Sequence, residues 1–548
     1  MQHRILPATA VFTLAAAVTA QTPGRTEPVD LPVIHRIRQE AMQNSKVMDH
    51  VFQLTDVTGP RLTNSPSYFA AANWVEKQLK EWGIDAHQEK WAYNGRSWTY
   101  SHFSAHLVEP AYAPLIGLPL AYTPGTNGKV SGEAMIATIA TDADMERYRG
   151  KLKGKILFLA VGRELAANTT PAATRYTDQQ LLALTAPAAG RGGNAPGSAA
   201  LAAGQDKGGG RGGQGGGNNN QAFTNRLNEF LKAEGVLVIV RIATGNSEVG
   251  TVFGQAGGSR DPKDPLPPPT VALTPEHYNR ILRLMDAKIP VKMEFEIEAK
   301  VLEDRTDSVN VIGELPGASR RDEVVMIGAH LDSWHGGTGA TDNAAGSAVM
   351  IEVMRILKTL NSPLARTVRL ALWGGEEQGL LGSRAYIDQH FSARDMNVKP
   401  EHAKLSGYFN VDNGTGKIRG VYLQGNDSIR PVFEAWLKPF EDLGASTLSI
   451  RNTTGTDHTN FDAVGLPGFQ FIQDPMDYNT RTHHSNMDVY DRVQREDLQQ
   501  IAAIVASFVY HAANREQLLP RKPLPAPPPA GRGAGATGAA ATAPANAQ

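Results

Sequence analysis

The sequence has 548 residues, with 54 Lys plus Arg against 55 Asp plus Glu, and it contains no Cys. At about 150 residues per domain, this length allows roughly three or four domains. The formal net charge of −1 gives no support for a nucleic-acid-binding protein, which needs a basic surface. The lack of Cys excludes disulfides, thiolate catalysis and Cys-ligated metals, so any metal must be bound by His and carboxylates.

The first twenty residues have the pattern of a signal peptide. His3 and Arg4 precede a mainly apolar run over residues 5–18, and the small residues ending at Ala20 suit a signal peptidase. We therefore expect cleavage after Ala20 and export to the periplasm or the extracellular space. No other apolar run approaches the ~20 residues that a membrane-spanning helix needs, so no membrane span is expected.

Two further segments have low-complexity composition. Residues 190–220 hold 13 Gly in 31 residues, and ordering them would cost backbone entropy with almost nothing to bury. Residues 516–548 are rich in Pro, Ala and Gly and have no apolar periodicity. We expect a disordered loop at 190–220 and a disordered tail at 516–548.

The remaining chain predicts two kinds of unit. Helical spacing of apolar residues over 33–54 and 68–82 predicts surface helices that cover a core. After about residue 110, short apolar runs broken by Gly and Pro predict a β-rich inserted domain over residues 111–304. Residues 33–110 and 305–515 would then form one discontinuous domain.

From residue 308 onward, strand and helix patterns alternate. Strand candidates are residues 309–313, 324–328, 368–373, 407–411 and 469–472, and a helix candidate is residues 343–360. This alternation predicts an α/β domain with a mixed, mostly parallel sheet and helices on both faces. Binding groups in such domains gather beyond the carboxyl ends of the strands.

Acidic and histidine side chains follow three successive predicted strands. The first of these strands runs into His330 and Asp332, the second into Glu376 and Glu377, and the third into Asp412. Asp342 lies at the head of the predicted helix. A single Asp there would most simply cap the helix, but together with the groups at the strand ends it favours a metal site.

These residues lie in runs that resemble the M28 family of zinc exopeptidases, especially its plasma glutamate carboxypeptidase (carboxypeptidase Q) branch. The runs are Gly328-Ala-His330-Leu-Asp332-Ser, Gly339-Ala-Thr-Asp342-Asn-Ala-Ala-Gly346, Trp373-Gly-Gly-Glu376-Glu377-Gln-Gly, Asn410-Val-Asp412 and Thr482-His-His484-Ser-Asn-Met-Asp488, with lesser marks in Gly59-Pro-Arg-Leu-Thr-Asn-Ser65 and Gly455-Thr-Asp457-His458-Thr-Asn-Phe461. In this family, the inserted domain would be a protease-associated domain, and the carboxypeptidase Q branch implies a homodimer.

The resemblance implies two zinc ions bridged by Asp342. His330 and Asp412 would complete the ligands of one ion, and Glu377 and His484 those of the other. Glu376 would be the general base rather than a ligand. Two neighbouring cations suit peptide hydrolysis because they stabilise both the attacking hydroxide and the developing oxyanion.

The resemblance assigns further residues less sharply. The family pattern places the metal ligand just before Ser or Thr, which favours His484 over His483 and leaves His483 near the substrate. Asp332 and Asp488 would accept hydrogen bonds from ligand imidazoles, or alternatively cap loops. By their composition, Asp457 and His458 could also bind a metal, but with five ligands already assigned we expect them to be pocket residues.

The resulting hypothesis is an exported di-zinc exopeptidase that acts on short peptides. An acidic cleft suits a substrate ammonium group better than a carboxylate, so aminopeptidase or dipeptidase action ranks above carboxypeptidase action. Three alternatives remain: a non-catalytic, receptor-like binding protein of the same fold, a glutaminyl cyclase-like acyltransferase with a single zinc, and a deacylase of the related M20 group. The presence of all five ligands and Glu376 disfavours the first, and His330 disfavours the second.

Overall fold

The computed structural model describes residues 27–187, 217–245, 249–393 and 396–525. The expected signal peptide and most of the Gly-rich stretch lie outside these residues. Within the described residues, no helix combines the length and apolar character needed to span a bilayer.

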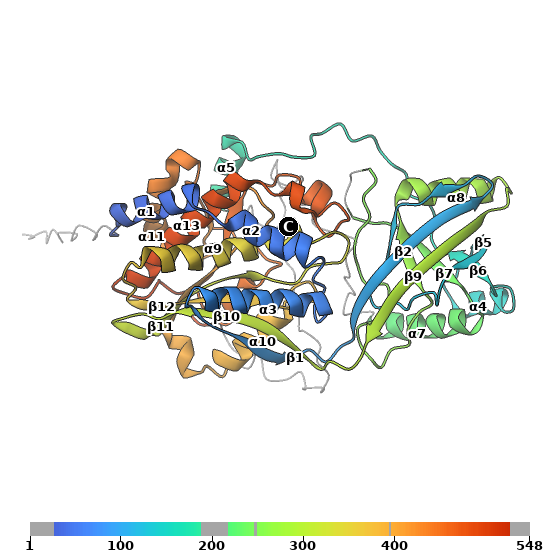
Figure 1. Cartoon of the computed structure of the whole chain (residues 1–548), viewed down its shortest axis with the longest axis horizontal. Coiled ribbons are helices and arrows are strands. Elements are labelled where there is room, and N and C mark those ends of the chain that lie inside the picture. Colours follow the sequence, from blue (N-terminus) through green and yellow to red (C-terminus); the bar gives the residue numbers. More distant parts are fainter. Residues whose placement is uncertain (1–26, 188–216, 246–248, 394–395, 526–548) are drawn as a thin grey trace, which may run out of the picture.

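Two eight-stranded sheets organise the chain, each in its own unit (Figure 1). The first sheet has the strand order β1-β10-β12-β11-β13-β16-β14-β15. Its strands are β1 Asp85–Ala92, β10 Asp307–Leu315, β11 Arg320–His330, β12 Arg366–Trp373, β13 Leu405–Asn410, β14 Ile418–Tyr422, β15 Thr447–Ser449 and β16 Gly468–Gln473. The central neighbours β12, β11, β13 and β16 are parallel, whereas β1, β10 and β14 join antiparallel.

The alternation of side chains along each strand separates two apolar layers. On β11, Val325 and Ile327 belong to the larger core, whereas Met326 packs on the opposite face with Trp373 and Tyr408. Successive side chains of a strand point to opposite faces, so a strand that is buried on both sides must be apolar throughout. The expected mixed sheet with helices on both faces is confirmed.

The helices of this first unit divide between the two faces. Those packed in the larger core are α1 Leu31–Gln43, α2 Val47–Phe52, α3 Pro66–Glu81, α9 Ala345–Leu360, α11 Arg430–Leu437 and α13 Arg495–Asn514, while α10 Leu381–His390 and α12 His458–Asp462 cover the other face. Local chemistry sets where α3 begins, because the Ser65 side chain accepts a hydrogen bond from the Tyr68 N–H and Pro66 occupies the first helical position.

The second sheet interrupts the first between β1 and β10, and has the order β3-β2-β9-β5-β6-β7-β8-β4. Its strands are β2 Ser97–Glu109, β3 Ala113–Pro114, β4 Gly117–Pro119, β5 Val130–Ile136, β6 Lys155–Phe158, β7 Val238–Ile242, β8 Thr270–Leu273 and β9 Lys292–Leu302. The helices among the described residues of this range are α4 Asp142–Tyr148, α5 Asp178–Thr185, α7 Gly217–Ala233 and α8 Pro275–Asp286. We call residues 97–302 the second unit, although α5 within this range packs against Ile472 of the first unit.

Three boundaries differ from the sequence-based expectations. Residues 97–109, expected in the discontinuous domain, form β2 and pair with β9 in the second sheet. Residues 217–220, expected in the disordered loop, begin α7. Residues 516–525, expected in the disordered tail, pack on the first unit, where Leu519 is buried and Lys522 pairs with Asp462. One buried apolar side chain, one ion pair and the hydrogen bonds of Arg521 to backbone carbonyls attach this segment, although its composition lacks periodicity.

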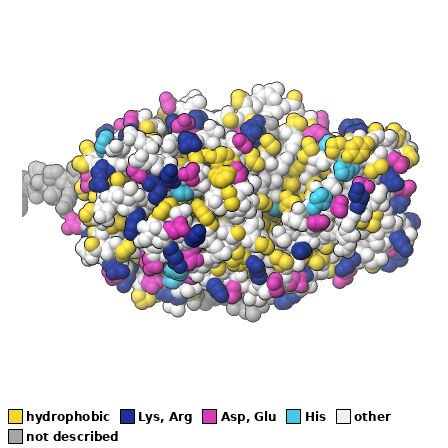
Figure 2. Space-filling model, viewed as in Figure 1, with side chains coloured by type: hydrophobic (Ala, Val, Ile, Leu, Met, Phe, Trp, Pro, Cys, Tyr) yellow, Lys and Arg dark blue, Asp and Glu magenta, His cyan; other side chains and the backbone are white. Residues whose placement is uncertain are grey.

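Acidic and basic side chains are interspersed over the face shown in Figure 2. Neither sign forms a continuous field there, in agreement with the net charge of −1. A polyanion would find no extended basic surface on this face.

Candidate metal centre

Parallel strands bring the predicted residues to one edge of the first sheet. β11 ends at His330 between β12 and β13. The loop after β12 carries Glu376 and Glu377, and the loop after β13 carries Asp412. Since the carboxyl ends of parallel strands meet at the same edge, residues more than 80 positions apart become neighbours.

His330, Asp342 and Asp412 form the first cluster. The His330 Nε2 lies 3.1 Å from Asp342 Oδ1 and 3.3 Å from Asp412 Oδ1, and all three side chains are buried. On the other side of the ring, Nδ1 lies 2.9 Å from the backbone carbonyl oxygen of Asp332. That hydrogen bond orients the imidazole so that Nε2 faces the two carboxylates.

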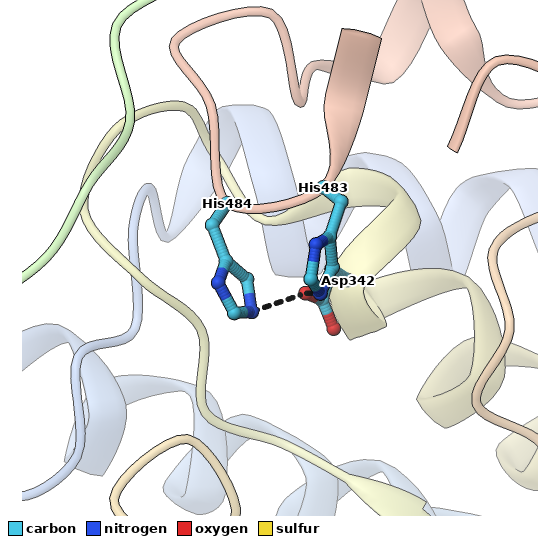
Figure 3. A group of neighbouring side chains, drawn as sticks. All are labelled: Asp342, His483 and His484. Atoms are coloured by element: carbon cyan, nitrogen blue, oxygen red, sulfur yellow. Dashed lines mark ion pairs between the residues drawn. The ribbon is translucent and has the colours of Figure 1, made fainter. Parts of the chain in front are cut away.

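The opposite oxygen of Asp342 faces a second cluster. His484 Nε2 lies 3.1 Å from Asp342 Oδ2 and 3.0 Å from Glu377 Oε2. His483 Nε2 lies 3.8 Å from the same Asp342 oxygen, and its ring stacks on His484 with the ring centroids 3.8 Å apart. Figure 3 shows both histidines directed toward Asp342. The carboxylate of Asp342 therefore lies between the two clusters, with one oxygen facing each.

These clusters fit metal ions in both spacing and chemistry. Donor atoms about 2.0–2.1 Å from a tetrahedral zinc lie ~3.3 Å apart, and the close contacts in each cluster are 3.0–3.3 Å. Imidazole nitrogens and carboxylate oxygens are the zinc ligands available without Cys. In addition, the buried Glu377 Oε1 has no hydrogen-bond partner, which is uncommon for a buried polar atom.

The electrostatics of the site also favour a bound cation. Burial raises the pKa of Glu376 well above its usual range, and the nearby Asp412 and Asp457 raise it further. Burial likewise raises the pKa of Glu377 to about 7. Confining several carboxylates in a low dielectric is unfavourable unless cations or protons offset their charge. Divalent ions held by the two clusters would supply that charge.

Asp332 orients the loop that carries the two glutamates. Its carboxylate accepts hydrogen bonds from the backbone N–H groups of Glu376 and Glu377, each at 3.3 Å, and from the Thr63 hydroxyl at 2.6 Å. The contact with the His330 ring is made mainly by the Asp332 backbone carbonyl, because its carboxylate lies 3.6 Å from Nδ1.

Of the two roles considered for Asp488, an imidazole partner or a loop cap, the hydrogen bonds of the structure fit the loop cap. Its two carboxylate oxygens accept the backbone N–H groups of Thr341 at 2.6 Å and Asp342 at 3.2 Å. Asp342 lies in the short turn Ala340–Ala344, where its own backbone angles are not helical (φ −134°, ψ 86°). Asp488 satisfies the N–H groups of Thr341 and Asp342 and so holds Asp342 in place.

Asp457 and His458 lie behind the site rather than in an open pocket. Both are fully buried. Asp457 accepts a hydrogen bond from the Ser383 hydroxyl, and burial raises its pKa to about 7. The cleft beside Asp342 is lined instead by Trp334, Gly336, Gly337, Gly339, Asp342, Glu377, His484, Ser485 and Asp488.

Sequence reasoning missed the role of Arg61. This buried guanidinium donates hydrogen bonds to the carbonyls of Leu54, Leu331, Thr338 and Gly339, at 2.6–2.9 Å. It thereby fixes the loop between His330 and Asp342. The only signal in the sequence was the family-like run around Gly59–Ser65, which assigned it no role.

The fold and the site together define a class of protein. Histidines and carboxylates gather at the carboxyl ends of the strands of an α/β unit, and this arrangement is typical of metallohydrolases. Residues 310–509 match the model of peptidase family M28. Residues 310–509 are therefore similar to an M28 peptidase domain, and the resemblance found in the sequence is confirmed.

Individual relatives agree with this result. Carboxypeptidase Q of Mus musculus is 29% identical over 272 residues, 50% of this chain and 56% of that protein, so the chain aligns with just over half of this relative. The crystal structure of a peptidase M28 precursor from Shewanella amazonensis SB2B is 25% identical with a TM-score of 0.60, covering 90% of this chain and 98% of that one. A zinc aminopeptidase from Bacillus subtilis is 18% identical with a TM-score of 0.52, covering 86% and 96%, and shows a shared fold.

Proposed function

We propose that this protein is a cocatalytic di-zinc exopeptidase that hydrolyses short peptides from a free terminus. The observation that carries the proposal is the position of Asp342, with one oxygen facing His330 and Asp412 and the other facing His484 and Glu377. Asp342 with His330 and Asp412 would hold one zinc, and Asp342 with Glu377 and His484 would hold the other.

The residues of the chain divide the chemistry among them. When bound, the two zinc ions supply the positive charge that lowers the pKa of water and stabilises negative charge on the substrate carbonyl oxygen. Glu376 lies beside the ligands without belonging to either histidine–aspartate cluster. It takes the proton of the attacking water and returns it to the leaving nitrogen, because a carboxylate beside the ligands but outside both clusters is free to accept and donate a proton.

The cleft favours a substrate ammonium group. Its lining includes the carboxylates of Asp342, Glu377 and Asp488 and contains no Lys or Arg among the described residues. A free amino terminus would therefore be attracted, whereas a carboxylate would find no cationic partner. Aminopeptidase or dipeptidase action is the first candidate. Carboxypeptidase action is the second, favoured by the match to carboxypeptidase Q.

The proposal extends to the setting of the enzyme. The charged start, apolar run and small residues of the first twenty positions support export to the periplasm or the extracellular space. The second unit would be a protease-associated domain, supported by its insertion between β1 and β10 of the peptidase sheet. Sequencing the amino terminus of the mature protein tests the export: a terminus at residue 21 is expected, and an uncleaved chain would refute it.

Zinc analysis combined with peptide hydrolysis tests the activity. Two zinc ions per chain are expected, together with cleavage of dipeptides and tripeptides whose amino terminus is free. Acetylated peptides should be poor substrates, and peptides amidated at the carboxyl end should remain good ones. Less than one zinc per chain, or no hydrolysis of any of these peptides by the zinc-loaded protein, would refute the proposal. The reverse preference between the two blocked series would establish the carboxypeptidase alternative.

A further inference from the structure

Residues 474–486 form the segment that brings His483 and His484 to the site, and we call it the histidine loop. It starts directly after β16 and carries a π-helical turn, Tyr478–Thr482, before the two histidines. His484 itself has φ of +57°, a left-handed conformation that a residue with a side chain keeps only where its surroundings hold it. The position of His484 therefore depends on what contacts this loop.

One stretch of the second unit pairs with the end of the loop. The Gly254 N–H donates to the His484 carbonyl at 2.7 Å, and the Asn486 N–H donates to the Val252 carbonyl at 3.0 Å. Between them, the Phe253 ring lies with its centroid 5.1 Å from that of His484. A Cβ at Gly254 would come within 2.9 Å of the Gly336 backbone. Residues 252–254 therefore approach the cleft as closely as a glycine permits.

Another stretch of the second unit forms hydrogen bonds with the beginning of the loop. The segment that precedes α5 crosses from the second unit to the first (Figure 1). Thr174 and Met476 exchange backbone hydrogen bonds at 3.0 and 2.8 Å, and the Thr480 hydroxyl donates to the Ala172 carbonyl at 2.7 Å. Met476 and Thr480 precede the two histidines, whereas the stretch around Phe253 contacts the residues at and after His484. The loop is therefore held at both ends.

Arg175 anchors this crossing segment by charge. Its guanidinium contacts Asp474 at 2.9 Å and Asp497 at 2.8 Å, and both of these carboxylates are buried. Arg419 also contacts Asp474, at 3.0 Å, but no other ion pair to Asp497 occurs among the described residues. Without Arg175, the buried carboxylate of Asp497 would lose its ion pair, and the segment would lose its strongest attachment to the first residue of the loop.

We propose that residues 172–176 and 252–254 of the second unit hold the histidine loop so that His484 meets Glu377 and Asp342, and that the second unit thereby sets how tightly the zinc at His484 is bound. Phe253 and Arg175 are positioning residues in this arrangement, since they act through the loop. The inference rests on the proposed di-zinc function and adds to it that the ligands of the two zinc ions are held by different parts of the chain. His330 ends β11 and Asp412 follows β13, so two ligands of the other zinc are held by the first sheet rather than by the histidine loop.

Zinc retention tests this arrangement without relying on activity. Wild-type protein and the variants Phe253→Leu and Arg175→Gln are dialysed against a chelator that buffers free zinc at a level where the wild type keeps two ions per chain. Each variant should keep one, because residues that orient a metal ligand typically change metal affinity by about 10- to 100-fold. Arg175→Lys keeps the charge but cannot contact Asp474 and Asp497 through two separate nitrogens. Its zinc content should therefore fall between those of the wild type and Arg175→Gln.

Matched controls separate positioning from general destabilisation. Phe295→Leu alters a buried aromatic side chain in the core of the second unit, and Arg226→Gln removes an ion pair to Asp142 on its surface. Both should retain two zinc ions. If Arg175→Gln fails to fold, Phe253→Leu carries the test.

The possible outcomes distinguish the two proposals. Two zinc ions in the wild type and in the folded positioning variants alike would overturn the inference while leaving the proposed function intact. Equal zinc loss in Phe295→Leu and Phe253→Leu would also overturn it. A wild-type protein that binds no zinc would refute the proposed function and this inference together.

Discussion

Replacing Glu376 by Gln tests the division of roles between two adjacent glutamates. The substitution keeps the size of the side chain and its backbone hydrogen bond to Asp332, but a neutral amide cannot accept the proton of water. General-base catalysis contributes about 10²–10⁴-fold, so kcat should fall by this factor, equivalent to about 3–5 kcal/mol in the barrier. Both zinc ions should remain.

The matched variant is Glu377→Gln. Because Glu377 Oε2 lies 3.0 Å from His484 Nε2, this change should lower zinc content toward one ion per chain. The assay combines zinc analysis with steady-state hydrolysis of a dipeptide at saturating substrate. Loss of zinc from Glu376→Gln, or its retention of wild-type kcat, would refute the assigned roles.

Four further predictions concern stability. Chelation of zinc should lower the thermal midpoint, because metal bound only to the folded state stabilises it by mass action; an unchanged midpoint would contradict a metal site. Hydrogen bonds from His50 and Arg355 overcome the effect of burial and lower the pKa of Glu352 to about 2. The ionised Glu352 should therefore add about 3 kcal/mol to the free energy of unfolding. This contribution is complete above the unfolded pKa near 4.5 and should be lost as the pH falls toward 2. Acid unfolding curves that are identical for the wild type and Glu352→Gln would refute this. Arg61→Met should cost about 3–5 kcal/mol in urea unfolding, since four carbonyls lose their donor, and a cost below 1 kcal/mol would contradict its role. Leu519→Ala should cost about 2–4 kcal/mol, whereas an unchanged urea midpoint would show that this residue adds nothing to the core.

The peptidase sheet was largely predictable because its pattern is local. β11 and β12 are buried on both faces, so they are nearly continuous apolar runs, and a run of that kind is visible in the sequence. The group of residues at the strand ends followed from the same reasoning, since a parallel sheet collects them at one edge.

Other features could not be predicted because they depend on partners far away in the chain. β2 carries no local sign that its partner is β9, about 190 positions later. For Asp488, the sequence left open a partner imidazole or a loop cap, and the structure shows that it accepts the backbone N–H groups of Thr341 and Asp342. Choosing between two such partners requires coordinates.

By itself, the sequence determined the alternation of strands and helices and the types of residue available for chemistry: His and carboxylates without Cys. Periodicity and composition are properties of the chain alone. The family resemblance implied that Asp342 lies between the two ligand sets. Only the tertiary structure decided that Arg61 fixes the loop beside it, and that residues 172–176 and 252–254 contact the histidine loop. These contacts join residues hundreds of positions apart, and hydrogen bonds over about 3 Å leave no periodic trace in a sequence.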